Sequence, residues 1–159
     1  MKKALVPLVG LAAVLFVAGC GKSSSSSSAP TGPQEIDLTA SDLMKYNITT
    51  IEATPGEELT VVLTNIGNSP ATVMEHNWVL LKQGSNPEQF SEAATAAGLS
   101  NGYIPPQLKD EIVAMIPLQG PHSSGQVTFK APMEPGDYPY LCTFPAHYQA
   151  GMHGVLTVK

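Results

Sequence analysis

The chain has 159 residues, 13 acidic and 8 basic side chains, and a formal net charge of −5 at pH 7. All of its basic residues are lysines. This acidic balance argues against nucleic acid as a partner, because nucleic-acid binding needs a basic face. The length is typical of one domain with additional terminal segments.

The first segment, residues 1–19, has the pattern of an export signal. Two lysines precede an apolar run over residues 4–17, and this run is shorter than the roughly 20 apolar residues that a membrane-spanning helix needs. The run ends in VAGC, with small residues directly before Cys20. This ending resembles the lipobox of bacterial lipoproteins, which implies cleavage before Cys20 and lipidation of its thiol. The alternative is a plain secretory signal with a chance cysteine.

Residues 20–34 are expected to form a lipidated, flexible tether. They contain six consecutive serines followed by prolines and glycine, and no side chain able to join a core. A tether of this length spans roughly 20 Å r.m.s.. Loss of residues 1–19 would change the net charge from −5 to −7, so attachment to an anionic membrane would depend on the lipid. The expected location is the extracytoplasmic face of a bacterial membrane, periplasmic or at the cell surface.

The chain has two cysteines, and lipidation of Cys20 would leave Cys142 as the single free thiol. Two cysteines used in this way cannot form a disulfide framework. A lone exposed thiol in an oxidising compartment is reactive. We therefore expect Cys142 to be buried or bound to a metal.

Residues 35–159 are expected to form one all-β domain. Short runs with alternating or β-branched residues are separated by turn sequences rich in proline and glycine. Strands at this spacing predict an eight-stranded Greek-key β-sandwich. The expected strands are 35–38, 47–53, 58–65, 72–81, 111–116, 125–131, 136–142 and 154–159.

One interval, residues 86–98, predicts a short helical insertion. It is rich in alanine and glutamate, begins with a capping asparagine at Asn86, and has Pro87 in its first turn. The sequence contains no internal repeat, no glycine-rich phosphate loop and no recognisable Ser-His-Asp arrangement.

Metal-binding side chains are concentrated near the end of the chain. Cys142, His147 and Met152 follow a C-x4-H-x4-M pattern. Thiolate, imidazole and thioether donors suit copper that cycles between Cu(I) and Cu(II), and a His₂Cys plane with a long axial Met is an electron-transfer copper site. The second histidine must come from elsewhere. Of the other histidines, His76 lies in a β-patterned run and His122 lies in a turn, where we expect it to be solvated.

Each of these residues also has an ordinary interpretation taken alone. A cysteine such as Cys142 is often a small buried hydrophobic residue. A strand histidine such as His76 is often a core or edge residue whose hydrogen bonds are satisfied. Together, these interpretations must explain both the terminal loop and a distant histidine followed by Asn77 and Trp78, which makes a shared metal the better explanation.

Two motifs carry a resemblance to a known family. The runs MEHNWVL (residues 74–80) and CTFPAH (residues 142–147) resemble the two copper motifs of the azurins. The similarity extends from about residue 44 to 159 and includes the helical insertion, so the resemblance implies a cupredoxin domain of the plastocyanin/azurin type over residues 35–159. Four residues separate His147 from Met152, one more than in azurin. This spacing matches the auracyanins, azurin-like blue copper proteins of filamentous anoxygenic phototrophs, and the lack of azurin's second cysteine pair fits the same branch.

The resemblance implies a role for each motif residue. His76, Cys142 and His147 would form the equatorial plane of one type 1 copper ion, and Met152 would be its weak axial ligand. Asn77 would hydrogen-bond to Thr143 beside the sulfur, and Trp78 would pack in the core. His153 is expected to face solvent, because successive side chains of a strand face opposite ways.

Two positions depart from the azurin pattern. Azurin has glycine before its first histidine ligand, and the carbonyl of that glycine approaches the copper; here the residue is Glu75, whose backbone carbonyl is a candidate fifth contact. The family's glycine before the second histidine is Ala146 here. Neither change removes a ligand.

We therefore expect a monomeric, membrane-anchored, mononuclear blue copper protein that is not an enzyme. It would transfer single electrons within a photosynthetic or respiratory chain, between membrane redox complexes or soluble cytochromes. One alternative is an extracytoplasmic copper chaperone or buffer, which the division of ligands between a strand and a terminal loop disfavours. Another is a copper-reductase module, for which the sequence has no further ligand cluster.

Overall fold

The computed structural model describes residues 33–159. The expected export signal over residues 1–19, the lipidation of Cys20 and nearly all of the tether lie outside the described residues and stay predictions. Within the described part, no helix is long and apolar enough to cross a lipid bilayer.

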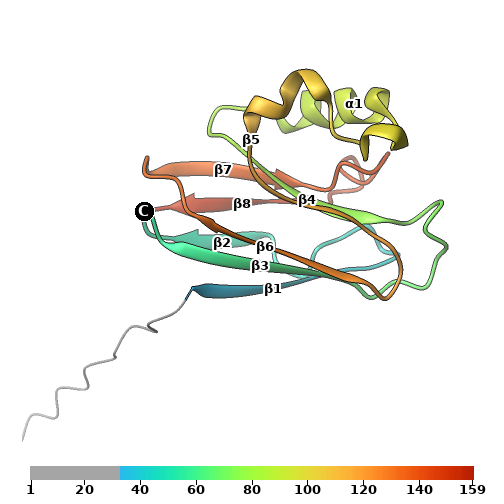
Figure 1. The fold of residues 1–159 in the computed structure, drawn as a ribbon, viewed down its shortest axis with the longest axis horizontal. Helices are drawn as coiled ribbons and strands as arrows, with labels where there is room; N and C mark the ends of the chain where they lie inside the picture. The colour runs from blue at the N-terminus through green and yellow to red at the C-terminus, as the bar shows by residue number, and fades with distance from the viewer. Residues whose placement is uncertain (1–32) are drawn as a thin grey trace, which may run out of the picture.

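Two β-sheets pack face to face (Figure 1). One sheet has the strand order β1-β3-β6 and the other the order β2-β8-β7-β4-β5. β1 pairs in parallel with β3, and β2 in parallel with β8, while the remaining pairs are antiparallel. This arrangement confirms the expected all-β sandwich with eight strands. The strands are β1 (Gln34–Ala40), β2 (Thr50–Ala53), β3 (Glu58–Asn65), β4 (His76–Leu81), β5 (Ile112–Gln119), β6 (Ser124–Lys130), β7 (Gly136–Leu141) and β8 (His153–Val158).

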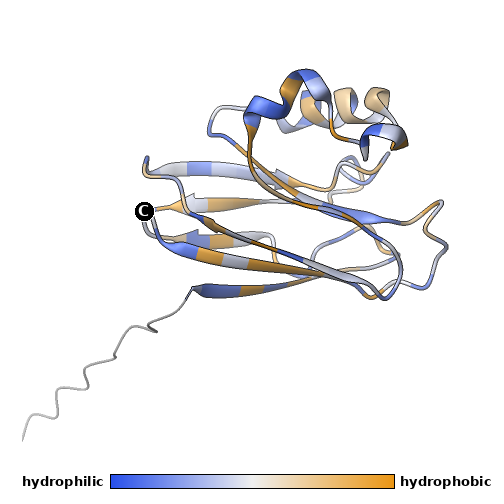
Figure 2. Ribbon diagram, viewed as in Figure 1, coloured by the Kyte–Doolittle hydropathy of each residue, from blue (hydrophilic) through white to orange (hydrophobic). Residues whose placement is uncertain are grey.

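Alternation along the strands separates a buried face from a solvated one. In β3, Leu59, Val61 and Leu63 are fully buried, and the apolar and polar bands that result are visible along the ribbon in Figure 2. The outward threonines pair with β6, as in the 2.8 Å hydrogen bond between the hydroxyls of Thr60 and Thr128. Burial of the inward face against the second sheet drives the assembly of the sandwich.

β4 is different, because all six of its residues are buried. Its outer face is covered by α1 (Pro87–Ala97) and by the segment that follows the helix. Val79 and Leu81 pack there with Phe90 of the helix, Ile104 and Leu141 in a second, smaller apolar cluster. The strand that supplies the first metal-binding histidine is therefore enclosed on both sides.

The expected helical insertion over residues 86–98 is confirmed. The side chain of Asn86 accepts hydrogen bonds from the backbone N–H groups of Glu88 and Gln89, each at 3.1 Å, and caps the helix. Gly98, with a φ of 72°, ends it. Two short 3₁₀ helices that the sequence did not predict follow it, η1 (Leu99–Asn101) and η2 (Pro106–Glu111).

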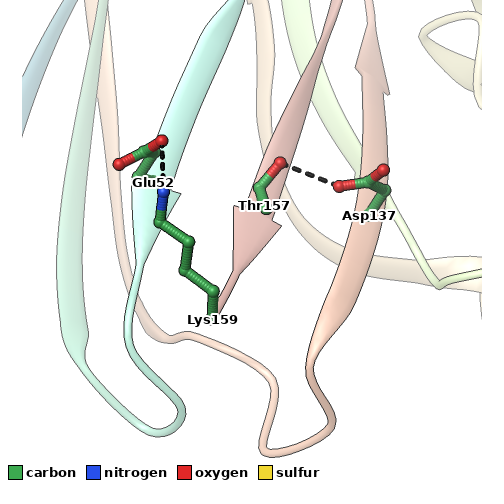
Figure 3. A network of polar contacts seen from close by, with 4 residues as sticks. All are labelled: Glu52, Asp137, Thr157 and Lys159. Atoms are coloured by element: carbon green, nitrogen blue, oxygen red, sulfur yellow. Dashed lines mark hydrogen bonds and ion pairs between the residues drawn. The ribbon is translucent and has the colours of Figure 1, made fainter.

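The sandwich has two distinct ends. β1 begins and β8 stops at one end, while β4 begins and β7 stops at the other (Figure 1). At the first end, polar contacts join neighbouring strands: Lys159 pairs with Glu52 at 2.6 Å, and the Thr157 hydroxyl donates to Asp137 at 2.8 Å (Figure 3). These exposed contacts contribute little to stability.

Candidate metal centre

Three side chains meet at the end of the sandwich where β4 begins. His76 is the first residue of β4, Cys142 directly follows β7, and His147 lies in the loop between β7 and β8. One ligand atom from each lies within 4.8 Å of the other two. The Sγ atom of Cys142 is 3.4 Å from Nδ1 of His147, and the two imidazole centroids are 4.9 Å apart. No other group of three or more His, Cys, Asp or Glu side chains converges in this way within residues 33–159.

The bonding of His76 indicates that the site is built for a metal ion. His76 is fully buried, and neither of its ring nitrogens has a hydrogen-bond partner among the described residues. Leaving a buried polar atom unpaired costs free energy. A copper ion held between these imidazoles and the thiolate would satisfy one of the two orphaned nitrogens, and a His₂Cys donor set is the one that type 1 copper uses. The residues present therefore fit the cofactor.

Burial sets the protonation states of the three groups. It lowers the pKa of His76 and of His147 to about 4 each, so both imidazoles are neutral at pH 7. Burial also raises the pKa of the Cys142 thiol to about 12, although the backbone N–H groups of Asn77 and Phe144 act in the opposite direction. The histidines are thus ready to bind a metal, whereas the thiol must lose its proton when the metal enters.

Asn77 and Thr143 join the two motifs. The Asn77 side chain donates to the Thr143 hydroxyl at 2.6 Å and accepts from the Thr143 backbone N–H at 2.8 Å, and both bonds are buried. The Tyr46 hydroxyl donates in turn to the Asn77 carbonyl. The contact that the family resemblance implied is therefore present. It fixes the residue after Cys142 against the residue after His76.

Met152 lies on the same loop as Cys142 and His147. Its side chain is fully buried, its backbone N–H donates to the His147 carbonyl at 2.9 Å, and its carbonyl accepts from the Cys142 N–H at 3.0 Å. His153 is exposed, as the alternation of side chains predicts, and its ring lies against that of Tyr148 in a tilted arrangement with centroids 4.9 Å apart. Met152 as the axial ligand stays a prediction, and so does the Glu75 carbonyl as a further contact.

The remaining candidates take the places expected of them. Trp78 is fully buried in the main core. His122 is exposed in a turn with a φ of 58°. Ala146, beside His147, is exposed and has a φ of 69°, a left-handed backbone conformation that suits the glycine of the family motif.

The motifs did not reveal two residues that support the site, Tyr46 and Asn65. Asn65 is a fully buried amide at the inward-facing end of β3, after Leu59, Val61 and Leu63. A polar residue at an inward position of an alternating strand is the signal that marks it in the sequence.

Comparison with known proteins agrees with the site. A family model described as copper binding proteins, plastocyanin/azurin family, matches residues 34–159. Auracyanin-A of Chloroflexus aurantiacus is 33% identical over 98% of this chain and 94% of its own length. Azurin of Pseudomonas aeruginosa is 33% identical over 78% of this chain and 84% of its own length. Auracyanin-B of Chloroflexus aurantiacus is 38% identical, but the match covers 62% of this chain and 42% of that protein.

Solved structures give the same result. The reduced auracyanin of the photosynthetic bacterium Roseiflexus castenholzii superposes with a TM-score of 0.70 at 32% identity, over 80% of this chain and 99% of that chain. Auracyanin A of Chloroflexus aurantiacus, a "blue" copper protein, superposes with a TM-score of 0.69 at 32% identity, over 80% of this chain and all of that chain.

Proposed function

The chain belongs to the plastocyanin/azurin family of copper-binding proteins, and on this basis we propose that it carries single electrons between redox partners while anchored to a membrane by a lipid on Cys20. It is a blue copper cupredoxin with one type 1 copper ion as its cofactor. When bound, the ion supplies a Cu(I)/Cu(II) couple. The proposed ligands are His76, Cys142 and His147, with Met152 as the weak axial ligand. The observation that carries the proposal is the convergence of three buried ligand atoms within 4.8 Å of one another.

The protein's own residues would hold the site rigid and dry. Asn77 and Thr143 tie the two ligand-bearing segments together through two buried hydrogen bonds. A frame of this kind resists movement of the ligands when the charge of the site changes, which keeps the rearrangement that accompanies electron transfer small. Outer contacts near the sulfur also tune the potential.

Electrons would enter and leave beside His147. Its side chain is only 2% exposed, and it lies next to the ring of Phe144, with centroids 4.7 Å apart, and beside the exposed Ala146. This apolar rim suits the small and brief contacts of redox encounters. Donor and acceptor would be membrane redox complexes or soluble cytochromes of a photosynthetic or respiratory chain. The carrier would act as a monomer and would make and break no covalent bonds.

The test of the ligand set is Cys142→Ser. The copper-loaded wild type should show an intense visible thiolate-to-Cu(II) band and the EPR spectrum of type 1 copper. The variant should lose this band, whereas the copper-free variant should keep the far-UV CD spectrum of the sandwich, because the strands fold around an apolar core. A variant that keeps the band would contradict the thiolate assignment.

A copper chaperone or buffer is the alternative function. Burial of all three ligand side chains disfavours it, because a protein that hands copper on needs accessible donors. Slow release of copper to a competing chelator, together with fast electron exchange, would support the carrier. Fast release without a visible band would support the buffer.

The membrane anchor needs its own test. Stable anchoring takes more than one acyl chain, so the mature wild type should sediment with membranes, and Cys20→Ala should be released or remain unprocessed. A soluble mature form with an unmodified Cys20, identified by mass spectrometry, would contradict the anchor and leave the copper site unaffected.

A further inference from the structure

Asn65 is a buried amide whose polar side-chain atoms contact three separate backbone groups. It is fully buried at the end of β3. Its Nδ2 donates to the carbonyl of Met74 at 3.3 Å and to the carbonyl of Gln119 at 3.0 Å. Its Oδ1 accepts from the backbone N–H of Gly67 at 2.9 Å. One side chain therefore joins both ends of the segment 66–75 to the end of β5.

The position of Asn65 makes this choice of residue informative. The alternation along β3 calls for an apolar side chain here, and an amide costs free energy to bury unless it is hydrogen-bonded. Its backbone is also held at this point, since its N–H donates to Ser123 and its carbonyl accepts from His122, both at 2.9 Å. A residue that departs from the local apolar pattern and still has hydrogen-bond partners for its buried polar atoms indicates a position with a functional or structural role.

The segment that Asn65 holds leads directly into the copper site. Residues 66–75 connect β3 to β4, and Met74 stands two residues before His76. His76 faces Gln119 in the β4–β5 pair, but the register shifts between His76 and Trp78. Such an irregularity disrupts the ladder locally, so strand pairing alone fixes His76 less firmly than an internal strand residue.

A second contact holds the other side of the same segment. The carboxylate of Asp42 accepts from the backbone N–H groups of Asn68 at 3.0 Å and Ser69 at 3.2 Å. Gly67 is packed closely between the side-chain oxygens of Asp42 and Asn65. A Cβ atom placed on Gly67 would come within 2.5 Å of Oδ1 of Asp42 and 3.0 Å of Oδ1 of Asn65. Asp42 thus holds the first half of the segment at Asn68 and Ser69, and Asn65 holds its two ends at Gly67 and Met74.

We propose that Asn65 is a positioning residue for the copper centre: by holding the Met74 carbonyl and the end of β5, it fixes the Met74–Glu75 peptide and the His76 imidazole. This inference rests on the ligand set proposed above. Asn65 is not one of the proposed ligands. It acts by limiting how far the His76 side of the site moves when the copper changes oxidation state.

The test replaces Asn65 with leucine, which is neutral, similar in volume and unable to form any of the three bonds. Asn65→Leu should keep the blue band, because no ligand is removed. Its electron self-exchange rate, measured by NMR line broadening, should fall by about tenfold, which is the lower end of the loss of metal affinity or activity that follows removal of an outer contact of a metal site. The reduction potential should shift, because the Met74–Glu75 peptide and the His76 imidazole are no longer held in one position and outer contacts tune the potential of a metal site.

A matched control separates positioning from lost stability. Leu63 lies two residues earlier on the same face of β3 and is fully buried, and its contacts do not include the segment's hydrogen bonds. Leu63→Ala should lower the melting temperature and leave the self-exchange rate and the potential of the folded protein unchanged. If Asn65→Leu resembles Leu63→Ala in all three measurements, the proposal is wrong.

Amide hydrogen exchange of the copper-free protein gives a readout that does not depend on the metal. Asn65→Leu should lose protection locally, at Gly67 and over the residues leading to His76, while Leu63→Ala loses it uniformly. If the leucine variant does not fold, Asn65→Ser, whose hydroxyl is too short to reach both carbonyls, replaces it with the same expected results. A wild type without a blue band would overturn the proposed function; a blue wild type with unchanged protection in the variant would overturn the role of Asn65 alone.

Discussion

Ala146 has a backbone conformation that side chains of L-amino acids rarely adopt. Its φ is 69°, in the left-handed region, where a Cβ atom costs roughly 1–2 kcal/mol. Glycine avoids this cost but loses more entropy on folding. We expect Ala146→Gly to raise the free energy of unfolding of the copper-free protein by about 0.5–1 kcal/mol, measured by urea denaturation. Ala150→Gly, in the same loop but outside the positive-φ residues, should lower it.

Met152 and His153 are neighbours with opposite burial, and this difference supports the prediction that Met152, and not His153, is the axial ligand. Met152 is fully buried and His153 is exposed. Met152→Leu should keep the blue band and raise the reduction potential, because an apolar side chain without a donor atom stabilises the more highly charged Cu(II) state less than an axial ligand does. His153→Ala should change neither. A spectrum altered by His153→Ala and untouched by Met152→Leu would mean that the loop register is shifted by one residue.

At the scale of elements, the sequence predicted the existence of the strands and the helix better than their boundaries. The run over residues 72–81 has a strand pattern throughout, yet β4 begins at His76. The preceding residues form a turn instead, in which the N–H groups of Val73 and Met74 both donate to Pro70. Hydrogen bonding within the turn overrides the local preference for a strand.

The sequence predicted the ligand residues of the candidate site, which lie in motifs, but not all of the contacts that hold these motifs in place. Cys142 and His147 follow from the spacing and chemistry of the terminal loop, whereas His76 follows from the resemblance of residues 74–80 to a copper motif of the azurins. The contacts of Asn65 do not, since they join segments 9 and 54 residues apart. The parallel pairing of β1 with β3 was also not predicted, because the period of a strand carries no information about the direction of its neighbour.

The helix α1 offers a prediction at its first turn. The Asn86 side chain caps the backbone N–H groups of Glu88 and Gln89, so Asn86→Ala should lower the free energy of unfolding by about 1 kcal/mol. Asn86→Ser should restore most of this loss, because serine is also a good cap. The blue band and the potential should stay unchanged in both variants, since the cap contacts no proposed ligand. Urea denaturation measures the free energy of unfolding, and a redox titration followed at the blue band measures the reduction potential.

The whole molecule should respond to acid through its two buried imidazoles. Burial lowers the pKa of His76 and of His147 to about 4, whereas an unfolded histidine has a pKa of about 6.5. Between these values the unfolded chain binds more protons than the folded one, so stability is full above about pH 6.5 and is lost as the pH falls toward 4.

The melting temperature of the copper-free protein should therefore fall between pH 7 and pH 4, as followed by CD. Copper should delay the fall to lower pH, because a ligated imidazole cannot take up a proton until the metal leaves. His153→Ala is the control, since His153 is exposed and is not a proposed ligand. A profile that is flat in the copper-free protein, or unaffected by copper, would contradict this account.

The two ends of the sandwich determine how an anchored carrier can meet its partners. The described chain enters β1 at the end opposite the copper site, and the eight residues of β3 between these ends span about 26 Å at about 3.3 Å per residue. With a lipid on Cys20, as proposed, an upright domain would hold His147 away from the bilayer, toward partners in the aqueous phase. A partner whose redox centre lies at the membrane surface would require the domain to rotate about its tether until His147 faces the membrane. The rate of electron transfer to such a partner would depend on how fast the tethered domain reorients. The rate of transfer to a soluble cytochrome would not depend on this reorientation.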